Sequence, residues 1–266
     1  VDNEKNWGRL GSFESQYGIV IHTLRRDSGD CPSKSAFVEI LKHRYKDIAS
    51  LNSNWETNFE SWEALSASAE TKARNNAVKA DYSALLTAFA EEYFRVVDNA
   101  LNDMMPNHLY MGVRMAPWGM NPEVVSAAKK YSDVVSYNFY KEGLRSEDWG
   151  FLADVNKPSI IGEFHMGSVS DTGFYHPGLI MAANQKDRGR MYQEYMRTVI
   201  DNPYFVGAHW FQYVDSPLTG RGYDGENYNV GFVTIADVPY PEMADAAREL
   251  NRDLYIRRFG DLKVND

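Results

Sequence analysis

The chain has 266 residues, of which 44% are hydrophobic and 14% aromatic, and this composition indicates a globular protein with a sizeable core. Its net charge of −9 argues against nucleic acid or an anionic membrane as a partner. One cysteine excludes an intrachain disulfide, and the six histidines lack the spacing of zinc sites, so neither a metal nor a cofactor is expected.

Short apolar runs alternate with stretches of helical periodicity along most of the chain. No run approaches the roughly 18 apolar residues of a membrane-spanning helix. In chain order, we predict a strand stub at 1–3, an aromatic-rich insertion over 7–80, a helix over 85–101, a strand over 109–114, a helix over 122–131, strands over 133–140 and 158–163, a helix over 185–200, a strand over 205–212, a Gly-rich insertion over 214–233 and a helix over 241–255.

Alternation of strands and helices predicts an α/β fold with a parallel sheet. A doubly wound sheet and a (β/α)8 barrel both fit this alternation. No Gly-rich turn of the dinucleotide-binding or phosphate-binding type follows a strand, which disfavours the Rossmann alternative. A barrel needs eight strands, whereas four and a stub are counted, so we expect residues 1–266 to form part of a single catalytic domain whose N-terminal strands lie outside the chain.

Two glutamates follow apolar strand segments at the expected positions for a pair of catalytic carboxylates. Glu4 follows the stub and Glu163 follows Ile160 and Ile161. In a closed barrel both would face the same mouth, where glycoside hydrolysis needs one carboxyl group as acid and the other as nucleophile or base. Asn3, beside Glu4, is expected to bond a sugar hydroxyl. A Glu in such a chain is most often a solvated surface group, so the pair alone is a weak signal.

Other polar and aromatic side chains at strand ends are expected to line the same mouth. A Tyr hydroxyl here would bond the nucleophile and favour its ionised form, and an indole would form the floor of a sugar subsite. The alternatives are a barrel plug for Trp210, a core tyrosine for Tyr140 and a structural role for His165. The predicted substrate-binding residues are Asn3, Arg114, Asn138, Tyr140, His165, Trp210, Gln212 and Asp215.

The assembled motifs resemble clan A glycoside hydrolases, which carry Asn-Glu after strand four, Asn-x-Tyr after strand six, Glu after strand seven and Trp after strand eight. Within that clan the chain is most similar to the family 50 β-agarases, over nearly its whole length. The specific parts of the resemblance are Gly162 to Gly167 and Trp210 to Tyr228. The resemblance implies a (β/α)8 TIM barrel, of which this chain covers about strands 4 (the stub) to 8 with long βα loops.

By this resemblance the protein is a retaining, exo-type β-agarase that releases neoagarobiose from agarose or agaro-oligosaccharides. Glu4 is then the acid/base, with the higher pKa of the two, and Glu163 the nucleophile. The resemblance also implies a secreted or periplasmic enzyme, and a missing N-terminal half of the same protein that completes the site. The rivals are another clan A retaining glycosidase, such as a β-galactosidase, and a non-catalytic sugar-binding fragment.

Overall fold

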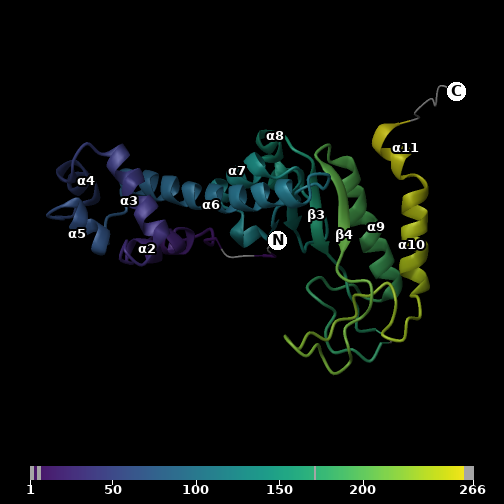
Figure 1. The fold of residues 1–266 in the computed structure, drawn as a ribbon. Coiled ribbons are helices and arrows are strands. Elements are labelled where there is room, and N and C mark those ends of the chain that lie inside the picture. The colour runs from purple at the N-terminus through teal and green to yellow at the C-terminus, as the bar shows by residue number, and fades with distance from the viewer. Residues whose placement is uncertain (1–2, 5–6, 171, 261–266) are drawn as a thin grey trace. The chain divides into compact units, whose positions relative to one another are not determined.

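The structure is a computed structural model that describes residues 3–4, 7–170 and 172–260. Of the predicted stub at 1–3, only Asn3 lies within the described residues. The chain divides into two compact units, Val1–Asp133 and Val134–Asp266. Figure 1 labels the main elements of each unit.

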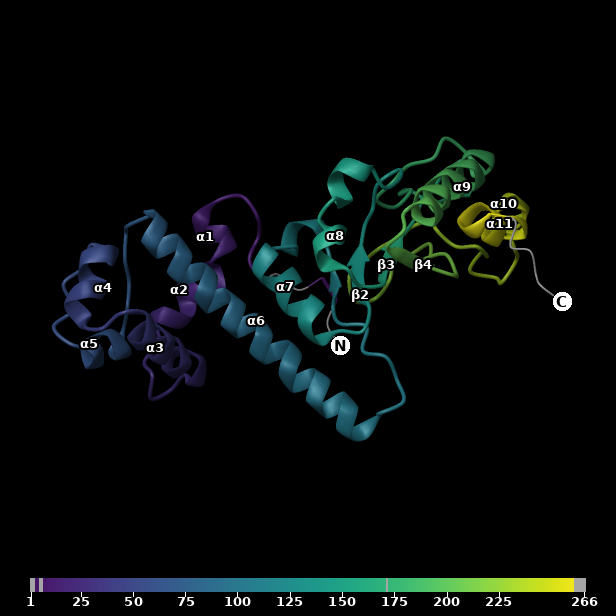
Figure 2. The ribbon, with the colours of Figure 1, turned by 90° about the horizontal axis from the view of Figure 1, so that it is seen from above.

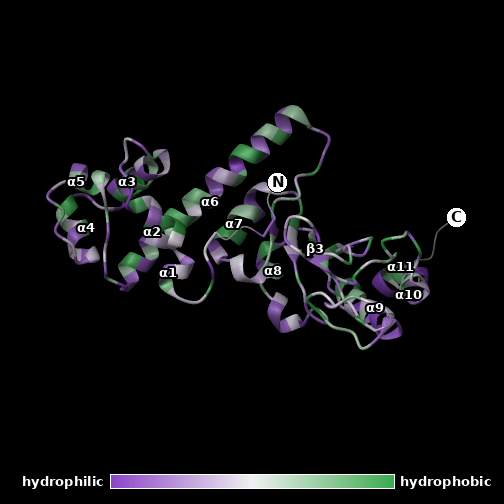
Figure 3. Cartoon of the chain, turned by 90° about the horizontal axis from the view of Figure 1, so that it is seen from below, coloured by the Kyte–Doolittle hydropathy of each residue, from purple (hydrophilic) through white to green (hydrophobic). Residues whose placement is uncertain are grey.

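The first unit is mostly helical, and the predicted insertion over 7–80 is a set of short helices. Its elements are α1 Phe13–Gln16, α2 Gly18–Leu24, α3 Pro32–Arg44, α4 Ile48–Trp55, α5 Trp62–Ala67, α6 Asn76–Met104, β1 Arg114–Met115, the 3-10 helix η1 Pro117–Gly119 and α7 Pro122–Tyr131. Helices α2 to α5 gather around the N-terminal half of α6 (Figure 2). Apolar and polar residues alternate along α6 (Figure 3), as its predicted amphipathic pattern requires.

A buried carboxylate organises the helical cluster around α6. Asp81 on α6 is almost fully buried and accepts hydrogen bonds from Arg44 Nε at 2.7 Å, Tyr45 Oη at 2.6 Å and Trp55 Nε1 at 2.7 Å. A buried carboxylate is stable only when such donors replace its hydration. The three bonds therefore fix α3 and α4 against α6.

The strand predicted over 109–114 is largely wrong. The structure has a strand only at β1, Arg114–Met115. Gly112 explains the difference, because its φ of +64° breaks an extended run and a Cβ there would lie 2.7 Å from Ser132 Oγ. The helix predicted over 85–101 is longer than expected and starts at Asn76, where the Asn75 side chain caps Val78 N.

The second unit is a parallel sheet covered by helices, which confirms the α/β prediction for this part of the chain. Its elements are β2 Val135–Asn138, the 3-10 helix η2 Ser146–Trp149, α8 Leu152–Val155, β3 Ser159–Phe164, α9 Gln185–Asp201, β4 Phe205–Trp210, α10 Pro241–Arg252 and α11 Leu254–Phe259. Strands β2, β3 and β4 lie side by side in chain order and are parallel. Helix α9 packs on β4 and α10 packs on α9 (Figure 1).

An aromatic stack holds α9 on the sheet. The Phe164 ring on β3 stacks on Tyr195 of α9 with a centroid distance of 4.2 Å, and Tyr195 Oη donates to Phe139 O at 2.8 Å. Because the Tyr195 ring stacks on Phe164 and its hydroxyl is bonded, this contact fixes the position of α9 along β3. The predicted helix over 241–255 is divided in the structure, since α10 ends at Arg252 and α11 begins at Leu254.

Candidate active site

Glu163 lies at the carboxyl end of β3, beside two of the predicted partners on β2. In the parallel register Asn138 is paired with Glu163, and Phe139 N donates to Glu163 O at 2.9 Å. Two residues after Asn138, Tyr140 Oη donates to Glu163 Oε2 at 2.7 Å. Glu163 is 7% exposed. The structure thus brings Asn138, Tyr140 and Glu163 together, as strand order in a parallel sheet predicts.

His165 lies beneath Tyr140, with its ring 4.7 Å from the Tyr140 ring. It is 1% exposed, and both ring nitrogens bond to backbone: Leu179 N donates to Nε2 at 2.7 Å and Nδ1 lies 3.0 Å from Phe211 O. Because Nε2 accepts, the proton belongs on Nδ1, which donates to Phe211. These bonds favour the structural alternative for His165, and direct sugar contact by its ring stays a prediction.

Burial lowers the pKa of His165 to about 4, so the ring is neutral at ordinary pH. The neighbouring loop approaches so closely that a side chain does not fit beside the ring. Gly178 has a φ of +89°, and a Cβ there would lie 2.6 Å from His165 Nε2. The imidazole consequently joins the loop after β3, the end of β4 and the Tyr140 ring.

Asp215 was expected at the mouth but lies in the interior, 3% exposed. Its carboxylate accepts bonds from Tyr240 Oη at 2.6 Å, Gly231 N at 2.7 Å and Asn229 Nδ2 at 3.0 Å. Donors from the protein replace the water that a carboxylate on a cavity wall would keep. Asp215 accordingly anchors the loop after β4, and its role as a sugar ligand stays an untested prediction.

Arg188 on α9 supplies the opposite charge in the same interior and is fully buried. Its guanidinium donates to Gly231 O at 2.8 Å, to Met166 O at 3.2 Å and to Gln185 Oε1 at 2.5 Å. Burial lowers the pKa of Arg188 to about 10, and the Asp215 charge opposes this shift. A buried cation that bonds the carbonyls of two loops holds both loops to α9.

Trp210 and Gln212 lie at and just beyond the end of β4. The Trp210 indole donates to Val230 O at 2.6 Å and packs edge-on against Phe164, with a centroid distance of 5.1 Å. Its N–H is therefore committed to the backbone, while its ring remains partly exposed. Gln212 Oε1 lies 3.5 Å from Arg221 Nη1 and is also partly exposed. Sugar contact by these two residues stays a prediction.

The first unit holds the other predicted residues. Asn3 forms a parallel bridge with Arg114, and Glu4 N donates to Arg114 O at 2.9 Å. Glu4 has a φ of +51°, a left-handed conformation that is uncommon for a residue with a side chain and recurs at functional sites. Glu4 thus directly follows a residue in a parallel pairing, and Glu163 is itself in one. Sugar binding by Asn3 and Arg114 stays a prediction.

The Gly-rich loop after β4 contributes an ion-pair cluster that the sequence did not single out as functional. Arg221 pairs with Glu226 and with Asp224 at 2.6 Å, and its guanidinium lies over the Phe211 ring at 5.4 Å. Desolvation raises the pKa of Glu226, and the nearby Glu163 charge adds to the rise. In the sequence, this cluster shows only as charged and aromatic residues between glycines. Such a composition indicates a loop but does not assign a role to any residue in it.

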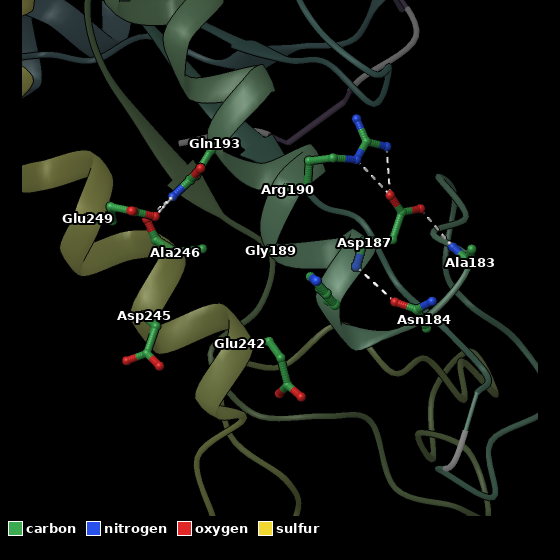
Figure 4. Close-up of a pocket in the computed structure, with 11 residues that line it drawn as sticks. Ala183, Asn184, Asp187, Gly189, Arg190, Gln193, Glu242, Asp245, Ala246 and Glu249 are labelled. Carbon is green, nitrogen blue, oxygen red and sulfur yellow. Dashed lines mark hydrogen bonds and ion pairs between the residues drawn. The ribbon is translucent and has the colours of Figure 1, made fainter.

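A separate cavity of about 700 Å³ lies between α9 and α10 (Figure 4). Its carboxylates are partly engaged, since Asp187 bonds Arg190 and Glu249 bonds Gln193. No aromatic side chain lines it. Within the described ranges there is no group of three or more His, Cys, Asp or Glu that could hold a metal, and no helix there is long and apolar enough to cross a membrane.

Comparison with known proteins places the chain in a family. A family model described as "Beta-galactosidase" of the glycoside hydrolase 42 type matches residues 25–160. "Beta-agarase B" of Vibrio sp. (strain JT0107) is 47% identical over 97% of this chain. Two solved structures, described as "The crystal structure of an agarase, AgWH50C" and "Structural analysis of an exo-beta-agarase", are 58% and 59% identical, each over 97% of this chain with a TM-score of 0.94.

The fold and the matches place the chain among the glycoside hydrolases. More narrowly, the chain belongs to the family 50 β-agarases, because the similarity to agarases extends over nearly all of it. The chain spans 27% of the length of the Vibrio relative, and 37% and 35% of the two solved chains. A more distant structure, described as "Crystal structure of BpGH50", shares the fold at 20% identity and a TM-score of 0.69.

Because His165 is buried as a neutral ring, the free energy of unfolding should fall as the pH is lowered. The unfolded chain binds a proton near pH 6.5 and the folded chain only near pH 4, so lowering the pH through this window favours unfolding, by up to about 3 kcal/mol at pH 4 and below. Unfolding in urea between pH 7 and pH 4 measures this slope. The His165→Gln variant should lose this contribution, and an unchanged slope would contradict the assignment.

The Arg188→Met substitution should lower the free energy of unfolding by about 3–5 kcal/mol, because it leaves Asp215 charged in the interior without its counterion. The matched control is Arg190→Met on the same helix, where Arg190 pairs with Asp187 and Glu194 at an exposed position. That control should cost less than about 1 kcal/mol. Equal losses in the two variants would show that Arg188 is not an anchor.

Proposed function

We propose that the protein is a retaining β-agarase in which Glu163 is the nucleophile and Glu4 the acid/base. One observation carries this proposal: Tyr140 donates to Glu163 at 2.7 Å at the end of a parallel strand. The hydroxyl orients one carboxylate oxygen of Glu163 and donates to its negative charge, as a tyrosine beside a catalytic nucleophile would. Asn138, paired with Glu163 in the register, is proposed to bind the sugar next to the reacting centre.

The catalytic domain is proposed to be a (β/α)8 barrel, of which residues 1–266 form the C-terminal part, from about strand 4 to strand 8. Three parallel strands in chain order with α9 against them support this proposal, as do the agarase structures of which the chain spans about a third. Upstream residues of the same protein would then complete the site. In a barrel of this type, strands that are consecutive in the sequence are neighbours in the sheet.

The proposed reaction is a double displacement. Glu163 attacks the anomeric carbon of a β-linked galactose and the glycosidic bond breaks, while Glu4 protonates the departing oxygen. Glu4 then takes a proton from water, whose oxygen displaces Glu163 from the sugar. This sequence requires the two carboxyl groups to be about 5–5.5 Å apart.

The substrate is proposed to be agarose or its oligosaccharides, cleaved in exo fashion to neoagarobiose by a secreted or periplasmic enzyme. Support comes from similar proteins described as a β-agarase and an exo-β-agarase. The second candidate is a β-galactosidase, which the family model over residues 25–160 favours. Activity on agarose against activity on an aryl β-galactoside separates the two.

Replacing the carboxylates in the whole protein should affect the two steps differently. Glu163→Gln should lower kcat on agaro-oligosaccharides about 10³-fold or more, because no covalent intermediate forms. Glu4→Gln should lower it about 10²- to 10⁴-fold, and least for a substrate whose leaving group needs no protonation. The product released first should keep the β configuration, as NMR of the fresh product would reveal.

The matched control is Glu194→Gln on the exposed face of α9, which should retain full activity. If Glu163→Gln kept wild-type turnover, the assignment of the nucleophile would fail. Wild-type hydrolysis of the aryl galactoside without agarose hydrolysis would instead favour the second candidate.

The Tyr140→Phe substitution removes the hydroxyl and keeps the ring that packs on His165. A hydrogen bond to a charged group is worth about 1.5–3 kcal/mol, so kcat should fall roughly 10- to 100-fold. Wild-type kcat in Tyr140→Phe would mean that Tyr140 does not act on Glu163.

A further inference from the structure

A second cavity of the second unit lies between the loop after β3 and the loop after β4. It has a volume of about 440 Å³, within the roughly 300–1,000 Å³ of ligand pockets. Residues from both loops line it, and we refer to it as the Tyr175 cavity. The lining residues used below are Tyr175, His176, Asp224, Glu226, Asn227 and Tyr228.

Aromatic rings form one wall of the Tyr175 cavity. Tyr175 is 89% exposed, and the His176 ring lies 4.8 Å from the Tyr228 ring at an interplanar angle of 34°. Tyr228 in turn lies 6.0 Å from His165, the ring beneath Tyr140. An exposed flat ring beside a fixed pair of rings offers a surface on which the C–H face of a pyranose packs, with its hydroxyls directed to polar groups.

Backbone contacts hold this wall in place without a ligand. His176 and Tyr228 form a parallel bridge, and Asn229 N donates to His176 O at 3.4 Å. Asn227 Oδ1 accepts from Tyr175 N at 3.2 Å. The two loops are therefore joined at the cavity, and its shape is largely organised before a sugar binds.

The polar side of the cavity is acidic. Asp224 and Glu226 line it, and no lysine or arginine is among the described residues that do so. Arg221 lies behind them and pairs with both, so two carboxylates face one guanidinium and a negative charge is in excess. Carboxylate oxygens accept hydrogen bonds from sugar hydroxyls, whereas a sulfate ester would meet like charge.

We propose that the Tyr175 cavity is a subsite for a neutral hexose unit of the polysaccharide, and that its acidic wall disfavours sulfated units. This inference rests on the proposed function, since it adds a subsite to the same substrate. Tyr228 connects the subsite to the reaction, because its ring lies 6.0 Å from that of His165, which contacts Tyr140 at 4.7 Å. Tyr140 in turn bonds Glu163, so a chain bound there could continue onto the rings.

The first experiment compares hydrolysis of neoagarotetraose and neoagarooctaose by the whole protein. In Tyr175→Ala the ratio of kcat/KM for the octaose to that for the tetraose should fall about tenfold, because the longer chain loses a stacked unit. Tyr175→Phe keeps the ring and should retain the wild-type ratio. The matched control is Tyr255→Ala on α11, also an exposed tyrosine but outside the cavity, which should leave both rates unchanged.

The outcomes separate the subsite from the catalytic proposal. If the wild type cleaves both sugars and Tyr175→Ala leaves the ratio unchanged, the subsite is wrong while the proposed function stands. If the wild type cleaves neither sugar, the proposed function fails. Calorimetric binding of the octaose then still tests the subsite, since Tyr175→Ala should weaken binding about tenfold and equal binding would overturn the inference.

The second experiment tests the preference for neutral sugar with octaoses that differ only in sulfate esters. The wild type should bind the neutral octaose more tightly at low salt, and added salt should narrow the gap because it screens the charges. Asp224→Asn should narrow the gap about two- to fivefold. Equal affinity of the wild type for the two octaoses, or a gap unaffected by Asp224→Asn, would overturn the charge argument.

Discussion

A fully buried arginine is the constraint on which the second unit depends. Arg188 projects from α9, and its guanidinium reaches the carbonyls of Met166, after β3, and Gly231, after β4. Long loops pay a large entropic cost to hold one conformation. A buried cation opposes this cost, because movement of either loop would leave the guanidinium buried without its hydrogen-bond acceptors. The loops that line the site are therefore held from the interior.

The carboxylate of Asp215 completes that constraint and explains why it is specific. Burying two opposite charges contributes little net stability, since desolvation offsets their attraction. The hydrogen bonds, however, specify one arrangement: Asp215 accepts from Tyr240, Asn229 and Gly231 N together. His165 extends the arrangement to Tyr140 through Leu179 and Phe211. A chain of fixed groups thus runs from α9 to the hydroxyl that bonds Glu163.

Periodicity was sufficient to find most elements of the second unit. The strands around Tyr137, Ile161 and Ala208 were apolar and short, and α9 showed one apolar face, so their places could be predicted. The strand at 109–114 failed because a single positive φ at Gly112 breaks it, and composition does not report a dihedral angle. Local patterns predict local structure. They do not report close approaches between distant segments, such as that of Gly112 to Ser132.

The site shows the same division between what sequence determines and what it does not. Glu163 and Tyr140 could be predicted because strand ends in a parallel sheet meet at one edge. The roles of His165 and Asp215 could not, since an anchor and a ligand are the same residue types at the same strand ends. Their hydrogen-bond partners are what the structure adds: both ring nitrogens of His165 bond to backbone, and Asp215 accepts from Tyr240, Asn229 and Gly231 N.

The surroundings of the carboxylate distinguish three acids of the second unit from one another. The oxygens of Asp215 accept bonds from three protein groups, so its charge serves structure. Glu226 shares Arg221 with Asp224 at the wall of the Tyr175 cavity, partly desolvated and partly paired, a state suited to binding hydroxyls. Glu163 receives a tyrosine hydroxyl at the end of its strand. Surroundings of this kind, more than residue type, decide whether a carboxylate holds a loop, binds a sugar or attacks carbon.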